Sequence, residues 1–220
     1  MNKAISAAAA AERIADGAVI MIGGFMGVGS PHRLIDELVR QKRTGLTIIA
    51  NDSARPGVGI GKLIDARAVR RLIATHIGTN AETQRQMIAG ELAVDLVPQG
   101  TLAERIRAAG HGLGGVLTPT GVGTIAAEGK QTLEVEGRTF LLETPLAADV
   151  ALIGCHRADY SGNLDYSLTA RNFNPLMAMA AGLVIAEPDA VVPVGVIPPD
   201  AVVTPHVLVD LFVQGEQRHG

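Results

Sequence analysis

Short apolar runs alternate with stretches of helical periodicity through the first half of the chain. Runs such as Val19–Ile22 and Val94–Val97 are typical of buried strands, and each leads through turn residues into an amphipathic stretch such as Ser30–Lys42. This alternation predicts an α/β fold with an open, mainly parallel sheet and helices on both faces, in three layers. The other strands predicted in this half are 46–50 and 69–75, and the other helices are 60–64, 81–89 and 101–109.

The pattern changes after Gly110, where glycines punctuate a long loop. Thr132–Glu136 alternates apolar and polar residues, Gly137 occupies the turn and Thr139–Leu142 returns, which predicts a β-hairpin. The hairpin therefore lies in an insertion after the fourth βα unit. The remaining predicted elements are strands over 150–154 and 183–186 and a helix over 173–180. Because no repeat and no linker is evident, residues 1–220 are predicted to form a single domain.

The composition agrees with a folded α/β protein. The 220 residues are 47% hydrophobic and 19% charged, which argues against disorder and for a large core. Only 3% are aromatic and none is tryptophan, so the core consists mainly of aliphatic side chains, as buried parallel strands prefer. A net charge of −3 without a basic run argues against nucleic acid as a partner, and no uncharged stretch is long enough for a membrane span.

The cysteine and histidine content limits the chemistry further. Cys155 is the only cysteine, so an internal disulfide and a zinc site with two thiolates from this chain are both excluded. A single cysteine fits a reducing compartment, and we expect the protein in the cytoplasm. Cys155 follows a predicted buried strand without an activating neighbour, so we expect a small core residue there. The six histidines lack the spacing of metal ligands, so no metal site is predicted.

Two glycine-rich stretches are similar to nucleotide-binding motifs, but each departs from its motif in residue type or in position. Gly57–Lys62 has Pro56 in place of the first P-loop glycine and Leu63 in place of the serine or threonine. Gly110–Gly115 spells a dinucleotide fingerprint, but it follows a predicted helix instead of a strand. A Gly-x-Ser-x-Gly elbow is also absent from the sequence. The sequence therefore gives no support for nucleotide binding or for a serine hydrolase.

The most informative stretch is Asp16–Pro31, in which a strand is followed by four glycines in seven positions and then by a helix. Ser30 is predicted to cap that helix and Pro31 to be its first residue. Glycines permit positive φ and leave the backbone bare, so a ligand could lie against it. The helix start behind them offers unpaired N–H groups and a partial positive charge, which favours an anion. The stretch is a candidate binding loop, and a ligand-free βα turn is the alternative.

Two carboxamides occupy equivalent places at the ends of other predicted strands. Asn51 follows the second strand, and Gln99 follows Val94–Val97, just before a helix that Thr101 is predicted to cap. Ligands in open parallel sheets bind at the carboxyl ends of strands, where these side chains join Gly23–Phe25. Carboxamides and backbone N–H groups are neutral donors that suit a carboxylate or a thioester oxygen, and loop capping is the alternative role.

Four segments follow one another in a characteristic order. Residues 16–31 read Asp-Gly, two residues, three apolar residues, Gly-Gly-Phe, three residues, Gly, one residue, Pro. The later segments are Val97–Arg107, Thr118–Thr124 and Ala170–Asn174. Together they resemble the alpha subunit of the family I coenzyme A transferases, and the resemblance extends roughly from residue 16 to residue 205.

The resemblance implies an enzyme that moves coenzyme A from an acyl-CoA to a free carboxylic acid by double displacement. In that family a glutamate attacks the thioester to give a mixed anhydride, the released thiolate attacks back to leave a glutamyl-CoA thioester, and the acceptor carboxylate completes the cycle. The glutamate belongs to the beta subunit, in a Ser-Glu-Asn-Gly setting, whereas this chain contains no Glu-Asn pair. No catalytic residue is therefore expected here, and the expected partner is a beta subunit in an α2β2 assembly.

The resemblance also implies the half of the site that this chain supplies. Gln99 resembles a glutamine that helps to hold the substrate carboxylate, and Asn51 is a second substrate-binding candidate. No cofactor or metal is implied, because coenzyme A is itself a substrate. The residues that resemble the coenzyme A contact signature are Gly23, Gly24, Phe25, Met26, Gly27, Val28 and Gly29.

The substrate acid is less closely defined. Thr75–Thr83 and Leu96–Arg107 most resemble the acetate/acetoacetate branch of the family, and a 3-oxoadipate or succinate branch is next. Two alternatives of other kinds are a stand-alone binding or sensor domain for a sugar phosphate or an acyl-CoA, and a scaffold that only supports a partner. A phosphate site would need cations near the strand ends, where only Arg33, Arg55 and Lys62 occur, none of them in a motif.

Overall fold

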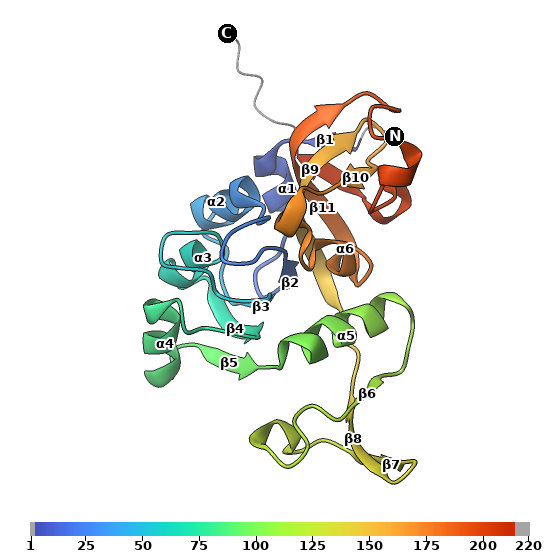
Figure 1. Cartoon of the computed structure of the whole chain (residues 1–220). Coiled ribbons are helices and arrows are strands. Elements are labelled where there is room, and N and C mark those ends of the chain that lie inside the picture. Colours follow the sequence, from blue (N-terminus) through green and yellow to red (C-terminus); the bar gives the residue numbers. More distant parts are fainter. Residues whose placement is uncertain (1–2, 214–220) are drawn as a thin grey trace.

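The computed structural model describes residues 3–213, in which a nine-stranded sheet is flanked by helices (Figure 1). The strands from the first half of the chain pair in parallel in the order β2-β3-β4-β5, as the alternating pattern predicts. These strands are β2 (Val19–Ile22), β3 (Leu46–Ile49), β4 (Val69–Ala74) and β5 (Ala93–Leu96).

On the other side of β2 the sheet continues through β9, β11, β12 and β1, again in parallel. The strand order therefore reverses between β2 and β9, which makes this place the topological switch point of the sheet. β12 and β1 bring the two ends of the described chain side by side at one edge. The strands are β9 (Ala148–Asp159), β11 (Ala181–Val192), β12 (Leu211–Val213) and β1 (Ala4–Ile5), with β10 (Leu164–Asp165) antiparallel to β9.

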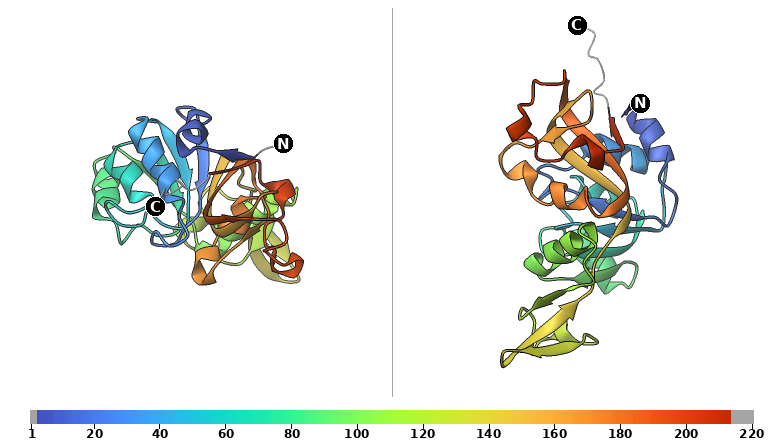
Figure 2. Two further views of the ribbon diagram at one scale, coloured as in Figure 1. Left: turned by 90° about the horizontal axis from the view of Figure 1, so that it is seen from above. Right: turned by 90° about the vertical axis from the view of Figure 1, so that its right-hand side faces the viewer.

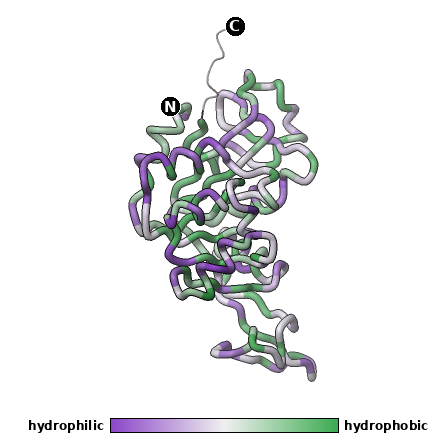
Figure 3. Tube along the Cα trace, turned by 90° about the vertical axis from the view of Figure 1, so that its left-hand side faces the viewer, coloured by the Kyte–Doolittle hydropathy of each residue, from purple (hydrophilic) through white to green (hydrophobic). Residues whose placement is uncertain are grey.

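Helices cover both faces of the sheet, as predicted. Ile20 and Ile22 of β2 join a hydrophobic cluster with α1, α2 and α3, whereas Met21 joins a second cluster with α5 and α6. This alternation along the strand separates the two cores, and hydrophobic segments run through the middle of the body (Figure 3). The helices are α1 (Ala7–Glu12), α2 (His32–Arg40), α3 (Gly61–Asp65), α4 (Ala81–Ile88), α5 (Gln99–Gly110) and α6 (Asn174–Met177). Short 3-10 segments are η1 (Ile125–Ala127), η2 (Leu168–Arg171), η3 (Pro199–Ala201) and η4 (His206–Leu208).

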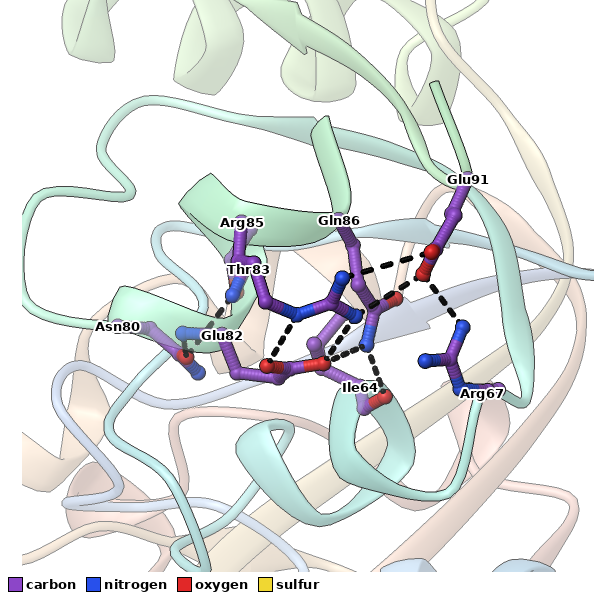
Figure 4. Close-up of polar contacts among 8 residues, drawn as sticks. All are labelled: Ile64, Arg67, Asn80, Glu82, Thr83, Arg85, Gln86 and Glu91. Atoms are coloured by element: carbon purple, nitrogen blue, oxygen red, sulfur yellow. Dashed lines mark hydrogen bonds and ion pairs between the residues drawn. The ribbon is translucent and has the colours of Figure 1, made fainter. Parts of the chain in front are cut away.

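The start of α4 is capped by Asn80. Oδ1 of Asn80 accepts hydrogen bonds from the N–H groups of Glu82 and of the residue after it, both at 3.1 Å. Figure 4 shows this cap together with Arg85, which pairs with Glu82 at 2.7 Å. Buried Gln86 donates to the carbonyl of Ile64 at 2.9 Å, so α4 is also tied to the end of α3.

Two other predicted helix starts are wrong. Ser30 does not cap α2, because its hydroxyl donates instead to the carbonyl of Gly23 at 3.0 Å, and α2 begins at His32. α5 begins at Gln99, two residues before the predicted cap, so Thr101 lies inside the first turn. The Thr101 hydroxyl is buried and has no hydrogen-bond partner in the described part of the chain. The local sequence did not reveal that Pro98 is the N-cap residue of this helix.

The predicted hairpin is present and lies in a second, antiparallel sheet that projects from the body (Figure 2). Glu136 and Gly137 connect its strands with φ of +51° and +74°, as a type I′ turn requires. We call residues 112–147 the arm. Arg105 of α5 ties its base to the body by donating to the carbonyl of Thr144 at 2.8 Å. The strands of the arm are β6 (Val116–Thr118), β7 (Thr132–Val135) and β8 (Arg138–Glu143).

Candidate functional site

The predicted binding positions meet at the carboxyl ends of the central strands. The glycine-rich turn follows β2, Asn51 follows β3, and Gln99 follows β5 at the start of α5. They share one open pocket of about 400 Å³ beside the switch point, where ligands of open α/β sheets bind. The residues that line this pocket are Phe25, Asn51, Gln99, Gly100, Ala103, Asn172 and Phe173.

The glycine-rich stretch ends in a tight turn that displays apolar side chains. Phe25 and Val28 exchange two backbone hydrogen bonds of 2.9 Å, and Met26 and Gly27 between them have φ of +52° and +89°. This is the geometry of a type I′ turn. The side chains of Phe25 and Val28 are 49% and 51% exposed, so the tip of the turn faces outward while Phe25 also forms one wall of the pocket.

The glycines of this stretch make room for the protein's own atoms. A Cβ at Gly23 would lie 1.7 Å from Oδ1 of Asn174, and a Cβ at Gly24 would lie 1.9 Å from Oγ of Ser30. A Cβ at Gly29 would lie 2.3 Å from the backbone oxygen of Ala170. The prediction that bare backbone leaves space for a ligand is therefore wrong at these three positions. Coenzyme A contact by residues 23–29 stays a prediction, and it now depends on the exposed tip of the turn.

The segment before α6 holds the turn in place. Asn172 accepts a hydrogen bond from the N–H of Gly24 at 3.1 Å. Asn174 is fully buried, accepts from the N–H of Gly154 in β9 at 3.1 Å, and donates to the carbonyl of Gly29 at 3.0 Å. The turn is therefore fixed to the strand on the far side of the switch point. The sequence resemblance included this segment without assigning it a role, and its two closely spaced asparagines were the available signal.

Asp52 connects the turn with the two carboxamides. Its buried carboxylate accepts hydrogen bonds from the N–H groups of Met26 at 3.0 Å and Ala54 at 2.7 Å, and from Nδ2 of Asn51 at 2.9 Å. Because a carboxylate only accepts, the Asn51 amide must turn its nitrogen toward Asp52, which leaves Oδ1 for Gln99. Nε2 of Gln99 donates to that oxygen at 2.5 Å. The sequence analysis missed Asp52, whose signal was its place beside Asn51.

The hydrogen bonds from Gln99 to Asn51 and from Asn51 to Asp52 leave one side of the Gln99 amide for a ligand. Asn51 uses one hydrogen on Nε2, whereas the second hydrogen and Oε1 have no hydrogen-bond partner within residues 3–213. The side chain of Gln99 does not cap α5 either. The side chain of Gln99 thus binds Asn51 and lines the pocket, and it is not a helix cap. Its free N–H suits a carboxylate or thioester oxygen.

The two helix starts near the site differ in electrostatics. The carboxylate of Glu187 in β11 accepts the N–H groups of Arg33 at 3.0 Å and Leu34 at 2.8 Å, so the positive end of α2 is already occupied. The anion that the start of α2 favours is therefore the protein's own Glu187 carboxylate, which takes the place of a ligand anion. α5 has no capping side chain, and Gly100 in its first turn lines the pocket with open space around its Cα. The positive helix end that faces the pocket belongs to α5.

Other reactive groups do not enter this pocket. Burial raises the pKa of the Cys155 thiol well above its ordinary value, and the carboxylate of Asp189 adds to this effect. Within residues 3–213, no cluster of three or more histidine, cysteine, aspartate or glutamate side chains could hold a metal ion. The helices of the same range also lack the length and apolar character needed to cross a membrane.

Sequence comparisons give close similarities over most of the chain. A family model described as Coenzyme A transferase matches residues 3–215. The chain is 56% identical to the acetate CoA-transferase subunit alpha of Escherichia coli strain K12 over 202 residues, which cover 92% of each protein. It is 50% identical to the acetoacetyl-CoA:acetate/butyrate CoA transferase alpha subunit of Clostridium acetobutylicum over 199 residues, or 90% of this chain and 91% of that one.

A structural comparison supports the fold. An acyl-CoA transferase from Escherichia coli O157:H7, solved as a thioester complex with CoA, matches 97% of this chain with a TM-score of 0.85. The identity is 22%, so the likeness concerns the fold alone. The present chain corresponds to 47% of that protein and thus spans about half its length.

Proposed function

The chain belongs to the coenzyme A transferase family, and on this premise we propose that it is the alpha subunit of an enzyme that transfers coenzyme A from an acyl-CoA to a short-chain carboxylic acid. The observation that carries the proposal is the Gln99–Asn51 pair, joined at 2.5 Å in a pocket whose other side chains are mostly apolar. Acetate or acetoacetate is the substrate that the sequence resemblance favours. The same resemblance supports an α2β2 assembly without a cofactor, and the single cysteine supports a location in the cytoplasm.

In this proposal the alpha subunit holds the acid. The free N–H of Gln99 and the open first turn of α5 at Gly100 donate to the carboxylate. Both are neutral donors, so the carboxylate keeps the electron density that it needs as a nucleophile. Phe25 and Phe173 line the site with apolar surface, which lowers the local polarity and strengthens the hydrogen bonds.

The covalent steps fall to a glutamate of the beta subunit. Its carboxylate oxygen attacks the acyl carbonyl, the C–S bond breaks, and coenzyme A leaves as a thiolate. The thiolate then attacks the glutamyl carbonyl of the mixed anhydride, which releases the first acid and leaves a glutamyl-CoA thioester. The second acid repeats the two steps in reverse. The residues that line the pocket include no glutamate, in agreement with a nucleophile from a partner.

A reconstitution experiment tests this proposal. The purified chain is assayed for acetyl transfer alone, and then with a candidate beta subunit that carries Ser-Glu-Asn-Gly. We expect no turnover by the single chain and robust turnover by the pair. After incubation with an acyl-CoA, borohydride should modify a glutamate of the partner, as read by mass spectrometry. Turnover by the single chain, or modification of one of its own glutamates, would show that the proposal is wrong.

The alternative of a sugar-phosphate sensor has less support. The pocket is not lined by lysine, arginine or histidine, and the start of α2, which a phosphate would use, is occupied by Glu187. A titration of the isolated chain with sugar phosphates and with acyl-CoA separates the possibilities. Tight binding of a sugar phosphate, without activity in the presence of the partner, would favour the sensor.

A further inference from the structure

We propose that this pocket selects short monocarboxylic acids over dicarboxylic acids, and that Ala103 sets the accepted chain length. The inference rests on the proposed function, because it assumes that the acid binds with its carboxylate at Gln99. It concerns the rest of the acid, which must lie against the other walls of the pocket. Those walls are formed by Phe25, Ala103 and Phe173.

The charge of the pocket argues for a monocarboxylate. The polar side chains that line it are the carboxamides of Asn51, Gln99 and Asn172, and none of the lining residues is charged. The nearest buried charge in this network, Asp52, is negative and already accepts three hydrogen bonds. A second carboxylate of a dicarboxylic acid that is held against these walls would therefore lose water without gaining a cation from this chain, which is strongly unfavourable.

Ala103 lies where the chain of the acid ends. It follows Gln99 by four residues in α5, so both side chains lie on the same face of the helix, one turn apart. An acid held at Gln99 and directed along the helix therefore meets Ala103 next. Ala103 also has the smallest side chain among the apolar walls, so the free space beside it is what a longer acyl chain would occupy.

The wall that carries Ala103 is rigid. Leu102 and Ile106 of α5 are fully buried in the hydrophobic cluster below the helix. Arg105 fixes α5 to the base of the arm by donating to the carbonyl of Thr144 at 2.8 Å. Because the helix is held on these sides, a larger residue at position 103 must fill the pocket instead of moving α5 away.

The test compares acids within one enzyme preparation. The complex of this chain with its beta subunit is assayed for kcat/KM with acetate, butyrate and succinate against one acyl-CoA donor. The native complex should use succinate at least about 100-fold less well than acetate, because the charge stays unpaired. Ala103→Leu should raise the acetate-to-butyrate ratio by about tenfold or more, the usual effect of one or two methylenes in an apolar pocket. Ala103→Gly should move the ratio the other way.

The ratio cancels any loss of folded or assembled enzyme, because both acids meet the same active sites. Ala81→Leu, at an exposed position of α4 outside the pocket, is the matched control and should leave the ratio unchanged. An unchanged ratio in Ala103→Leu, or succinate used as well as acetate, would overturn the inference while the proposed function stands. An assembled complex that transfers to none of these acids would overturn both.

Discussion

Gln99 is the residue whose loss should affect transfer with the least effect on folding. Its side chain makes one hydrogen bond, to Asn51, and otherwise faces the pocket. Gln99→Ala in the reconstituted complex should raise the barrier for transfer by about 1–3 kcal/mol, the usual cost of a lost hydrogen bond to a charged group. Gln99→Glu should be worse, because it places a like charge beside the incoming acid. Steady-state kinetics that vary the acid and the acyl-CoA separately measure both effects.

The prediction for Gln99 has a control and a result that would contradict it. Assembly of the complex, measured by size-exclusion chromatography, should be unchanged in both variants. Rates equal to those of the native complex would mean that Gln99 only fixes Asn51 and that the acid binds elsewhere.

Asp52 should matter for stability as well as for the site. In Asp52→Asn an NH2 group replaces one acceptor oxygen, so at least one of the buried donors from Met26, Ala54 and Asn51 loses its partner. The free energy of unfolding should fall by about 1–3 kcal/mol. Asp36→Asn is the control, because the Asp36 carboxylate is 54% exposed and its loss should cost far less. Urea denaturation measures the free energy of unfolding of both variants. Equal losses in the two variants would contradict the proposed role of Asp52 in holding these three donors.

Cys155 should be dispensable for transfer. Burial raises the pKa of its thiol, so the reactive thiolate is scarce at neutral pH. Cys155→Ala should therefore keep kcat within about twofold and lose only about 1 kcal/mol of stability. Iodoacetamide should label the native chain much more slowly than the urea-unfolded chain. A large loss of kcat in an assembled Cys155→Ala complex would refute this expectation.

Among the elements, α2 shows how a distant strand stabilises a helix start. Glu187 in β11 accepts the N–H groups of Arg33 and Leu34, and this contact joins residues about 150 positions apart. Glu187→Gln keeps the shape but removes the charge and one acceptor, so unfolding should become easier by about 1–2 kcal/mol. Thermal denaturation measures the change, with exposed Glu128→Gln as the matched control. Equal melting temperatures would mean that the helix start needs no charge.

The elements themselves could be predicted where local pattern determines them. The short, mainly apolar runs of β2, β3, β4 and β5 and the alternating residues of β7 and β8 all form strands. Asn80 caps α4 because an asparagine before a helix binds its first N–H groups regardless of the rest of the fold. The family segments contain the turn and Gln99, and the position of Asn51 after a predicted strand added that residue. All three line the pocket or lie beside it.

Contacts that form only in the folded chain explain what the sequence could not predict. β9 and β11 extend to twelve residues because they pair with each other through polar positions that no apolar run marks. Ser30 has the residue type and position of a helix cap, but its hydroxyl donates a hydrogen bond to the carbonyl of Gly23. Gly23 leaves room for the side chain of Asn174, 151 residues further along the chain. Gly24 leaves room for the side chain of Ser30, which is 6 residues further along. Such partners become visible only when the chain is folded.

For the whole molecule, ionisation sets a pH window of stability. Hydrogen bonds from Arg40 lower the pKa of Glu37 to about 2, and those from Arg85 lower the pKa of Glu82 to about 2. A lowered carboxyl pKa stabilises the fold above the unfolded value of about 4.3 and loses that effect as the pH falls toward 2. Burial raises the pKa of Cys155 and Tyr166, so stability also falls once the pH exceeds the unfolded values of about 8.5 and 10.

Urea midpoints at pH 3, 7 and 10 should therefore be highest at pH 7. The carboxylates of Glu37 and Glu82 belong to surface ion pairs, so 0.5 M salt should reduce the difference between pH 7 and pH 3. The alkaline loss should be insensitive to salt, because it arises from burial. A midpoint at pH 3 equal to that at pH 7 would contradict the assignment.

The pairing of β1 with β12 has a consequence for biosynthesis. Residues 4–5 form their sheet contacts with residues 212–213, so β1 has no partner on this side until about 200 further residues have been synthesised. At the usual rates of translation this interval is roughly 10–40 s. The edge of the sheet is completed only after β12 has been made, and until then the growing chain exposes β1 without this partner. Assembly with a partner through this part of the molecule must therefore wait for β12, and the unfinished chain is a natural client for chaperones.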